Sequence, residues 1–321
     1  MKTMMKTAGA ATLLAMAVAG TTAMADPLET LYFSQNAGWL DPLVDFDTGA
    51  GMAFEGFSDD TDQTGDGAPA DTYKTMSWRG TEPTPVSSID ITGYTEDNSP
   101  LRFKEDQTTP DADGEWNAGD WWVITELLQI NNVLQLNTGG TGIVPDPLWI
   151  ADTLANLYIY SDDAETMKIF EDLNSKVQIE FWETYNTFAD CRFSPTPLGT
   201  QCDDVFRVTE ADFDPVKFWY DGVKYSIDFA VWPGPSTNQG APAGTSLVCP
   251  NPFDARCDDV DVTKGETWVF TPEYNPGTSS IFVAAQWRVL PIPEPSIVGL
   301  FGVGMLALGL AGRRRKQVKK A

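Results

Sequence analysis

Apolar and polar residues alternate with a period of two along several stretches in the middle of the chain. Val177, Ile179 and Phe181 fall on one face of such a stretch, and longer alternating runs occupy residues 223–232 and 280–290. β-branched and aromatic residues dominate these runs, as they do in strands. Because successive side chains of a strand point to opposite faces, the alternation predicts half-buried β-strands.

Turn signals rich in Gly and Pro separate the alternating runs. They are Asp221-Gly222, Pro233-Gly234-Pro235, Lys264-Gly265 and Asn275-Pro276-Gly277. The last of them joins residues 267–271 to residues 280–290, which predicts a terminal antiparallel hairpin. Helical periodicity is confined to residues 165–173 and, as a weaker candidate, residues 148–157.

Many spaced strands with few helices predict an all-β fold. We expect an antiparallel β-sandwich of the jelly-roll-like kind, in which each of two sheets buries one face against the other. The chain has no internal repeat of about 20–50 residues, which argues against a solenoid or a propeller. The Gly- and Pro-rich stretch 238–244 lies between strand-like runs and is interpreted as a loop, so residues 26–290 are expected to form one domain.

The composition narrows the possible functions. The 321 residues include 21 Lys and Arg, 46 Asp and Glu and no His, for a formal net charge of −25. The lack of histidine excludes Ser-His-Asp and Cys-His catalysis and every His-containing metal site. The acidity argues against nucleic-acid binding, which needs clustered Lys and Arg. The excess of acidic residues is compatible with binding of divalent cations or with a salty medium, although a solvated acidic surface is the simpler explanation.

Residues 1–25 have the pattern of a secretory signal peptide. Its positive, apolar and cleavage segments are Lys2 and Lys6, residues 8–20, and Ala23-Met24-Ala25. We therefore expect export, with Asp26 as the first residue of the mature protein. The alternative is a buried N-terminal helix.

Residues 291–321 contain three consecutive features. They are the tripeptide Pro293-Glu294-Pro295, the uncharged run 296–312, and the basic residues Arg313, Arg314, Arg315 and Lys316. The uncharged run is at the lower limit of the length that spans a bilayer as a helix. By the positive-inside tendency, the basic cluster is expected to stay in the cytoplasm.

This three-part tail resembles the PEP-CTERM sorting signal. In that family an exosortase, a membrane-embedded cysteine transpeptidase of Gram-negative bacteria, is thought to recognise the tripeptide and remove the tail. The resemblance implies that an exosortase is the processing partner and that the inner membrane holds the chain transiently through a transmembrane sorting helix at residues 296–312. An ordinary C-terminal membrane anchor is the alternative, and both interpretations place the body outside the cytoplasm.

Two internal segments resemble THxN-family PEP-CTERM proteins. Trp78, followed by Ser87-Ser88, is similar to that family's early Trp-Gly-Thr-Pro and Ser segments. Residues 127–134 lie where the family carries a Leu-Thr-His-x-Asn-Asn-Pro-Ile type run, but the signature histidine is missing. The matches in this run are Asn131 and Asn132, and the departures are Leu128, Gln129 and Val133. The resemblance implies a surface or matrix protein without a defined biochemical activity.

The four cysteines form two close pairs, Cys191 with Cys202 and Cys249 with Cys257. Neither pair has the C-x-x-C spacing, and a four-thiolate zinc site would need tighter spacing within each pair. In an exported chain, two local disulfides are the simplest interpretation. Each would close a Pro-containing loop and stabilise the fold by about 2–3 kcal/mol, so their expected role is structural and not catalytic.

One acidic segment resembles the first half of a calcium-binding loop. Counted from Asp60 as position 1, oxygen-bearing residues follow at suitable spacing, and Gly65 permits the sharp turn at position 6. The candidate ligands are Asp60, Asp62, Thr64, Asp66 and Asp71. A flexible acidic loop is the alternative, because Asp71 replaces the usual Glu and Pro69 disfavours a regular loop. Residues 111–115 are a further candidate of the same kind.

Aromatic and acidic residues suggest two other chemistries. Exposed tryptophans could stack on sugar rings, although filling the core is the alternative role. The tryptophans concerned are Trp116, Trp121, Trp122, Trp182, Trp219 and Trp232. Two carboxylates suffice for glycoside hydrolysis, but so many acids guarantee chance pairs. Glu180, Glu183 and Glu273 are places to look for such a pair, and no residue is assigned a catalytic role.

The sequence as a whole predicts an exported, exosortase-processed protein of the cell surface or extracellular matrix. Its expected role is structural or adhesive, within an exopolysaccharide or biofilm, with exopolysaccharide as a candidate partner. A carbohydrate-binding module is the alternative function, and a glycoside hydrolase is a more distant one. We expect no enzymatic activity and no required cofactor, with calcium as the one candidate ion.

Overall fold

The structure is a computed structural model that describes residues 26–47, 52–60, 69–80, 86–103, 115–132, 134, 147–184, 197–199, 202–209, 213–251, 254–258, 260–273 and 276–291. The chain divides into two units, and each is described by itself. The larger unit holds Leu28–Phe218 and Ser226–Arg288, and the smaller unit holds Met1–Pro27, Trp219–Tyr225 and Val289–Ala321. The core and the site described below belong to the larger unit.

Apart from two short 3-10 turns at Glu96–Asn98 and Ala255–Cys257, every regular element of the described residues is a β-strand. The strands are β1 (Thr30–Leu40), β2 (Asp45–Phe46), β3 (Ala53–Asp60), β4 (Thr72–Arg79), β5 (Val86–Gly93), β6 (Arg102–Phe103), β7 (Trp116–Asn117), β8 (Trp121–Asn131), β9 (Trp149–Tyr160), β10 (Lys168–Trp182), β11 (Asp204–Thr209), β12 (Val216–Tyr220), β13 (Val223–Asn238), β14 (Ala241–Thr245), β15 (Leu247–Cys249), β16 (Glu266–Thr271) and β17 (Gly277–Leu290). The predicted all-β fold is confirmed.

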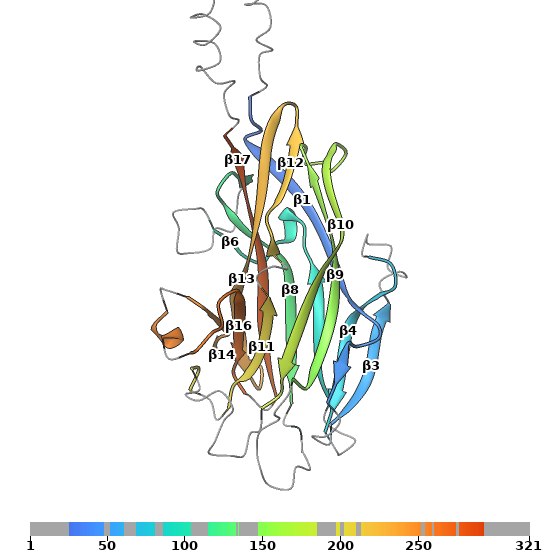
Figure 1. The fold of residues 1–321 in the computed structure, drawn as a ribbon, viewed down its shortest axis with the longest axis vertical. Coiled ribbons are helices and arrows are strands. Elements are labelled where there is room, and N and C mark those ends of the chain that lie inside the picture. Colours follow the sequence, from blue (N-terminus) through green and yellow to red (C-terminus); the bar gives the residue numbers. More distant parts are fainter. Residues whose placement is uncertain are drawn as a thin grey trace, which may run out of the picture. The chain divides into compact units, whose positions relative to one another are not determined.

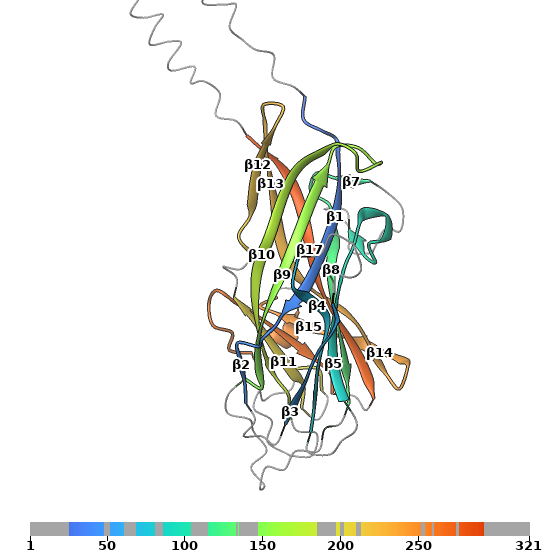
Figure 2. The same ribbon diagram turned by 90° about the vertical axis from the view of Figure 1, so that its right-hand side faces the viewer.

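Antiparallel pairing connects the strands into one continuous sheet. β9 lies between β1 and β10, so that Tyr160 is opposite Tyr32 on one edge and Lys168 on the other. β9 and β10 run side by side in both Figure 1 and Figure 2. From β10 the pairing continues through β11 and β16 to β15. From β1 it continues through β4, β5 and β8 to β17.

The sheet closes on itself at β13. This strand pairs with β17 and β14, and the backbone N–H of Ser246 donates to the carbonyl of Gly234, which joins β13 to the chain between β14 and β15. A Cβ on Gly234 would lie 2.6 Å from the carbonyl oxygen of Ser280 in β17, so this close approach requires glycine. One closed antiparallel sheet thus takes the place of the two separate sheets expected from the sequence. Alternation predicts which residues share a face but not which strands are neighbours.

The two helical predictions are wrong. Residues 149–157 lie in β9, which Leu148 directly precedes, and residues 165–173 span a turn and the beginning of β10. In that turn the carboxylate of Asp162 accepts hydrogen bonds from the backbone N–H of Met167 (2.7 Å) and from the hydroxyl of Thr166 (2.6 Å). Pairing along both edges of β9 outweighs the weak helical periodicity.

The predicted hairpin between residues 267–271 and 280–290 is also wrong. The first of these segments lies in β16, and both edges of β16 are occupied. Phe270 is opposite Val205 of β11 on one side and Leu247 of β15 on the other. Because a strand has only two edges, β16 cannot also pair with β17, which pairs with β8 instead.

Two local predictions are confirmed. In the smaller unit, Asp221-Gly222 forms a turn in which both residues have positive φ (47° and 81°), as a two-residue hairpin turn requires. In the larger unit, Cys249 and Cys257 form a disulfide with their Cα atoms 5.6 Å apart. Cys202 is also disulfide-bonded, and its predicted partner, Cys191, lies outside the described residues.

Aromatic side chains form a buried cluster in the core. Trp149 packs against Phe181 with ring centroids 4.9 Å apart, and Phe181 packs against Phe206 at 4.6 Å. Trp78 contacts Trp149 at 5.8 Å and Phe181 at 5.1 Å. Because the indole N–H of Trp78 also donates to the carboxylate of Glu183, the aromatic cluster provides an apolar wall for that acidic side chain.

Candidate functional site

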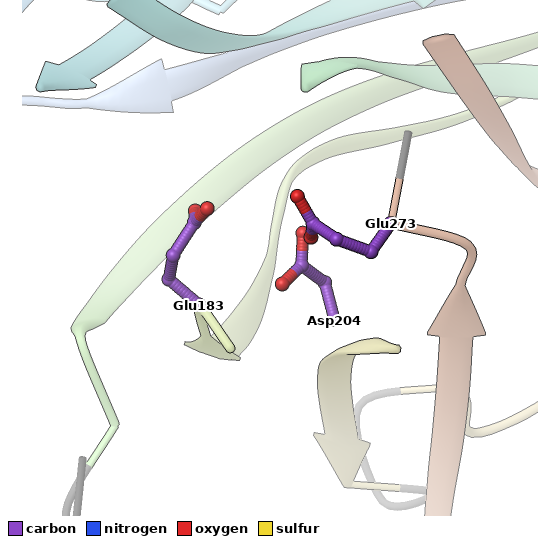
Figure 3. A group of neighbouring side chains, drawn as sticks. All are labelled: Glu183, Asp204 and Glu273. Atoms are coloured by element: carbon purple, nitrogen blue, oxygen red, sulfur yellow. The ribbon is translucent and has the colours of Figure 1, made fainter. Parts of the chain in front are cut away.

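Three acidic side chains meet where β10, β11 and β16 are neighbours. Glu183 directly follows β10, Asp204 is the first residue of β11, and Glu273 lies two residues beyond β16. Because the three strands are antiparallel neighbours, these positions lie at the same end of the sheet. Figure 3 shows the three side chains gathered there, and one carboxylate oxygen of each lies within 4.8 Å of the others. We call this group the carboxylate cluster.

Asp204 is the most strongly hydrogen-bonded member of the cluster, and it is fully buried. Its Oδ1 accepts a hydrogen bond from the backbone N–H of Thr184 (2.8 Å), and the hydroxyl of the same residue shares its proton between this oxygen (3.1 Å) and the carbonyl of Cys202 (2.9 Å). Its Oδ2 accepts from the side-chain amides of Gln129 (2.9 Å) and Asn131 (2.8 Å). Four donors thus stabilise the charged form of this carboxylate.

Neighbouring side chains fix the rest of the cluster. The hydroxyl of Thr271 donates to Oε1 of Gln129 (2.7 Å), so the amide nitrogen of Gln129 is the atom that faces the cluster. Asn131 donates to Oε2 of Glu273 (2.9 Å) as well as to Asp204. The indole N–H of Trp78 donates to Oε2 of Glu183 (2.9 Å). The cluster therefore connects β4, β8, β10, β11 and β16.

Burial raises the pKa of each of the three carboxyl groups. For Glu183 and Glu273 burial is the largest cause and the negative charge of Asp204 adds to it, so both pKa values lie well above their usual range. Burial raises the pKa of Asp204 only to about 6, because the backbone N–H of Thr184 and the other donors favour its charged form. At neutral pH Asp204 is therefore largely ionised, whereas burial and the negative charge of Asp204 favour the protonated forms of Glu183 and Glu273.

The cluster also contains buried oxygens without a partner. Oε1 of Glu183 and Oδ1 of Asn131 accept no hydrogen bond from the described residues, and the two side chains belong to residues that are 2% and 1% exposed. Neither Glu183 nor Asp204 forms an ion pair with a Lys or Arg in the described part of the chain. Since buried polar atoms are normally hydrogen-bonded, the arrangement can exchange protons or hold a cation.

Two of the three acids singled out in the sequence belong to the cluster. These are Glu183 and Glu273. The third, Glu180, lies within β10 and forms an ion pair with Arg207 of β11, which also pairs with Glu266 (3.2 Å). Glu180 is therefore part of a cross-strand ion-pair network and not of the cluster.

Sequence reasoning missed Asp204, whose only signal is an acidic residue at the beginning of the apolar run of β11. It also missed Gln129 and Asn131 as site residues. Both lie in the segment that resembles the THxN run, and Gln129 occupies the position of the missing histidine. Trp78 comes from the other resembling segment. Side chains from both segments thus contact the same carboxylate cluster.

The tryptophans considered for carbohydrate binding fall into three groups. Trp116, Trp122 and Trp182 are buried, in agreement with a core role. Trp121 and Trp232 are half-buried, and their ring centroids are 6.0 Å apart. Trp219, in the smaller unit, is 57% exposed. Among these six, Trp219 presents the most accessible ring.

The predicted calcium loop is described only at its two ends. Asp60 is the last residue of β3, and Asp71 directly precedes β4 and has a positive φ of 58°. Asp62, Thr64 and Asp66 lie outside the described residues. Of the further candidate at residues 111–115, Glu115 is described, and its Oε2 accepts a hydrogen bond from the hydroxyl of Thr30 (3.0 Å).

The predicted terminal signals lie outside the described residues. They comprise Ala23 and Ala25, Pro293, Glu294 and Pro295, the run 296–312, and Arg313, Arg314 and Arg315. Within the part of the chain that the structure describes, no helix has the length and apolar character needed to cross a membrane.

Comparison with known families supports the sorting signal. Residues 291–316 match the family model of the PEP-CTERM protein-sorting motif. The match covers the Pro293-Glu294-Pro295 tripeptide and the basic cluster that follows the uncharged run. Proteins with this motif are exosortase substrates, so the chain is sorted for export to the cell surface or the extracellular space. No curated protein and no solved structure matches the chain.

The free energy of unfolding in cation-free buffer is expected to fall as the pH rises above about 5. The raised pKa values of Glu183 and Glu273 let the folded state keep protons that the unfolded chain, with Glu pKa values near 4.3, has already released. Each such proton lowers the free energy of unfolding by up to about 1.4 kcal/mol per pH unit. The substitution Glu183→Gln should flatten the dependence by up to that amount, as measured by urea unfolding in EDTA.

The matched control is Glu29→Gln, because Glu29 is exposed. This variant should keep the pH dependence of the unmodified protein. A Glu183→Gln variant with the same slope as the unmodified protein would show that Glu183 titrates normally in the folded state.

Proposed function

Because the chain carries a PEP-CTERM sorting motif and is exported, we propose that its β-sheet body is a structural or adhesive component of the cell surface, within an exopolysaccharide or biofilm matrix. The observation that carries this proposal is the position of the motif. The motif begins at residue 291, and β17 ends at Leu290. The sorting tail and the sheet share no residues, so the tail can be removed while the whole sheet remains.

The last strand is held by contacts within the sheet. β17 pairs with β8 as far as Gln286, which is opposite Trp121. Trp287 is buried, and its indole N–H donates to the carbonyl of Trp116 (2.9 Å). These contacts lie before the motif, so the body is expected to stay folded after processing.

Charge and disulfide bonding support a location outside the cytoplasm. A formal net charge of −25 favours solubility, and disulfides such as Cys249–Cys257 persist in oxidising compartments. The proposal includes passage through the inner membrane of a Gram-negative cell, removal of residues 1–25 as a signal peptide, and transient retention through residues 296–312.

Deletion of residues 293–316 in the producing cells tests the proposal. Without the tripeptide, the apolar run and the basic cluster, exosortase has no substrate, so the protein should be released into the medium or fail to reach the surface. Cell fractionation and intact-mass measurement would detect the change. The unmodified protein should have lost its terminal segments and kept residues 26–290.

Deletion of residues 317–321 is the matched control, because these residues lie beyond the matched motif. This variant should be sorted normally. If the 293–316 deletion leaves the distribution and mass of the protein unchanged, the tail does not direct sorting and the proposal fails.

A carbohydrate-binding module is the second candidate, and the exposed ring of Trp219 is the observation that favours it. An exposed indole can stack on a sugar ring. Electrophoresis in gels containing the cells' own polysaccharide measures such binding. The protein should be retarded, Trp219→Ala should abolish the retardation, and Leu173→Ala, at another exposed apolar side chain, should not. Absence of retardation for the unmodified protein would reject this candidate.

The carboxylate cluster does not favour a glycoside hydrolase. Such an enzyme needs a glycosidic bond placed between two carboxyl groups. Asp204 is fully buried and Glu183 is 2% exposed, so a polysaccharide has no access to both groups. The chemistry of the cluster is better suited to a small ion than to a polymer.

A further inference from the structure

The spacing of the carboxylate cluster matches the size of one cation with its oxygen ligands. Calcium binds oxygens at about 2.3–2.6 Å, so two ligands on opposite sides of one ion are up to about 5 Å apart. One oxygen each from Glu183, Asp204 and Glu273 lies within 4.8 Å of the others. A single ion can therefore contact all three side chains after small movements.

Asn131 supplies an observation that does not depend on the acids. Its side chain is directed into the cluster, because Nδ2 donates to Asp204 and Glu273. Its Oδ1 is buried and has no hydrogen-bond partner among the described residues. Rotation of the amide by half a turn would place this oxygen where the nitrogen now lies, facing the same carboxylates. Oε1 of Glu183 is a second buried oxygen without a described partner.

Hydrogen bonds from residues other than the two glutamates fix the position of Asp204. Thr184 holds its Oδ1 through backbone and side chain, and Gln129, oriented by Thr271, holds its Oδ2. Such supporting hydrogen bonds orient the ligands of metal sites. The cluster thus has one rigid carboxylate, while the side chains of Glu183 and Glu273 are long enough to adjust.

From this geometry we propose that Glu183, Asp204 and Glu273 bind a calcium ion, with Oδ1 of Asn131 as a further ligand. All these donors are oxygens, which suit hard cations and disfavour zinc or copper. Calcium accepts irregular arrangements of six to eight oxygens, whereas magnesium demands a near-ideal octahedron and usually keeps several waters. The burial of Glu183 and Asp204 favours calcium, because it leaves little room for a hydrated ion.

This site shares no residue with the predicted calcium loop at residues 60–71, and it does not depend on the proposed matrix role. Bound calcium would link the ends of β10, β11 and β16 to β8 through four side chains. Extracellular calcium modules bind with dissociation constants of about 10⁻⁴–10⁻³ M. An exported protein with such a site would become fully stable only where calcium is abundant, outside the cell.

Calcium titration of the protein recovered from the producing cells, stripped with EDTA and desalted, tests the proposal at a fixed pH of 7.5. We expect saturable binding by calorimetry and a rise in Tm with calcium that magnesium at the same concentration does not match. Glu183→Gln and Asp204→Asn should each weaken binding by about tenfold or more, because the number of charged ligands sets the affinity. Glu29→Gln should bind like the unmodified protein.

Two further variants separate this site from the loop and from a loss of folding. Asp62→Asn removes a candidate ligand of the predicted loop but no ligand of the proposed site, so it should leave binding intact. Asn131→Leu removes an amide ligand but no charge, and it should weaken binding while far-UV circular dichroism remains that of a β-sheet protein. Terbium, a luminescent substitute for calcium, offers a second readout. Its emission should be excited through tryptophan, since Trp78 contacts Glu183, and calcium should displace it.

Three outcomes would overturn the proposal. They are no calcium-dependent change in the unmodified protein, a larger response to magnesium than to calcium, and loss of binding in Asp62→Asn with retention in folded Glu183→Gln. None of these outcomes bears on tail processing, so the proposed function would stand or fall separately.

Discussion

β11 pairs with β10 on one edge and with β16 on the other, in a register that sets Val205 opposite Trp182 and Asp204 opposite Thr271. This register decides the chemistry at that end of the sheet. Because side chains alternate between faces, a slip that put Val205 in the place of Asp204 would move the carboxylate to the opposite face and leave an apolar residue at the site. The donors from β8 and the two glutamates would then have no common partner. The candidate site is therefore a consequence of strand pairing, which the closure of the sheet fixes.

The same arrangement creates an electrostatic problem within the core. Glu183 accepts a hydrogen bond from Trp78, which packs on Trp149 and Phe181, so a carboxyl group is in contact with the aromatic cluster. Burying ionised groups without a cationic partner is unfavourable. The hydrogen bonds to Asp204 offset part of this cost, and protons on the glutamates or a bound cation offset more. The surroundings of the cluster thus couple the stability of the sheet to its ionic conditions.

The features predicted correctly from the sequence depend on residues that are close together along the chain. The Asp221-Gly222 turn and the Cys249–Cys257 disulfide are local, and alternation correctly marked the strands that became β13 and β17. The helical predictions failed because weak periodicity was outweighed by pairing along both edges of β9. The terminal hairpin failed because β11 and β15 occupy both edges of β16. These two errors concern which distant segments become neighbours. Two local predictions were also wrong, because the turn signal at residues 233–235 lies within β13 and most of the predicted loop 238–244 lies in β14.

The candidate site was also predicted only in part, because its residues come from segments that are far apart in the sequence. Glu183 and Glu273 could be singled out as acids on or after strand-like runs, but nothing in the local sequence joins them to Asp204. Asn131 lies 142 residues from Glu273 along the chain and is nevertheless within hydrogen-bonding distance of it. The sorting tail, in contrast, is a continuous motif that needs no folded partner, and it was recognised from its residues alone.

A double-mutant cycle on Glu183 and Glu273 tests most directly whether these acids share one buried cluster. The free energy of unfolding would be measured at pH 7.5 in EDTA for Glu183→Gln, Glu273→Gln and the double variant. Both carboxyl groups lie beside Asp204 in one buried cluster, so the two effects should depart from additivity by more than about 0.5 kcal/mol. Effects that add within that margin would show that the two side chains are independent, and would contradict the account.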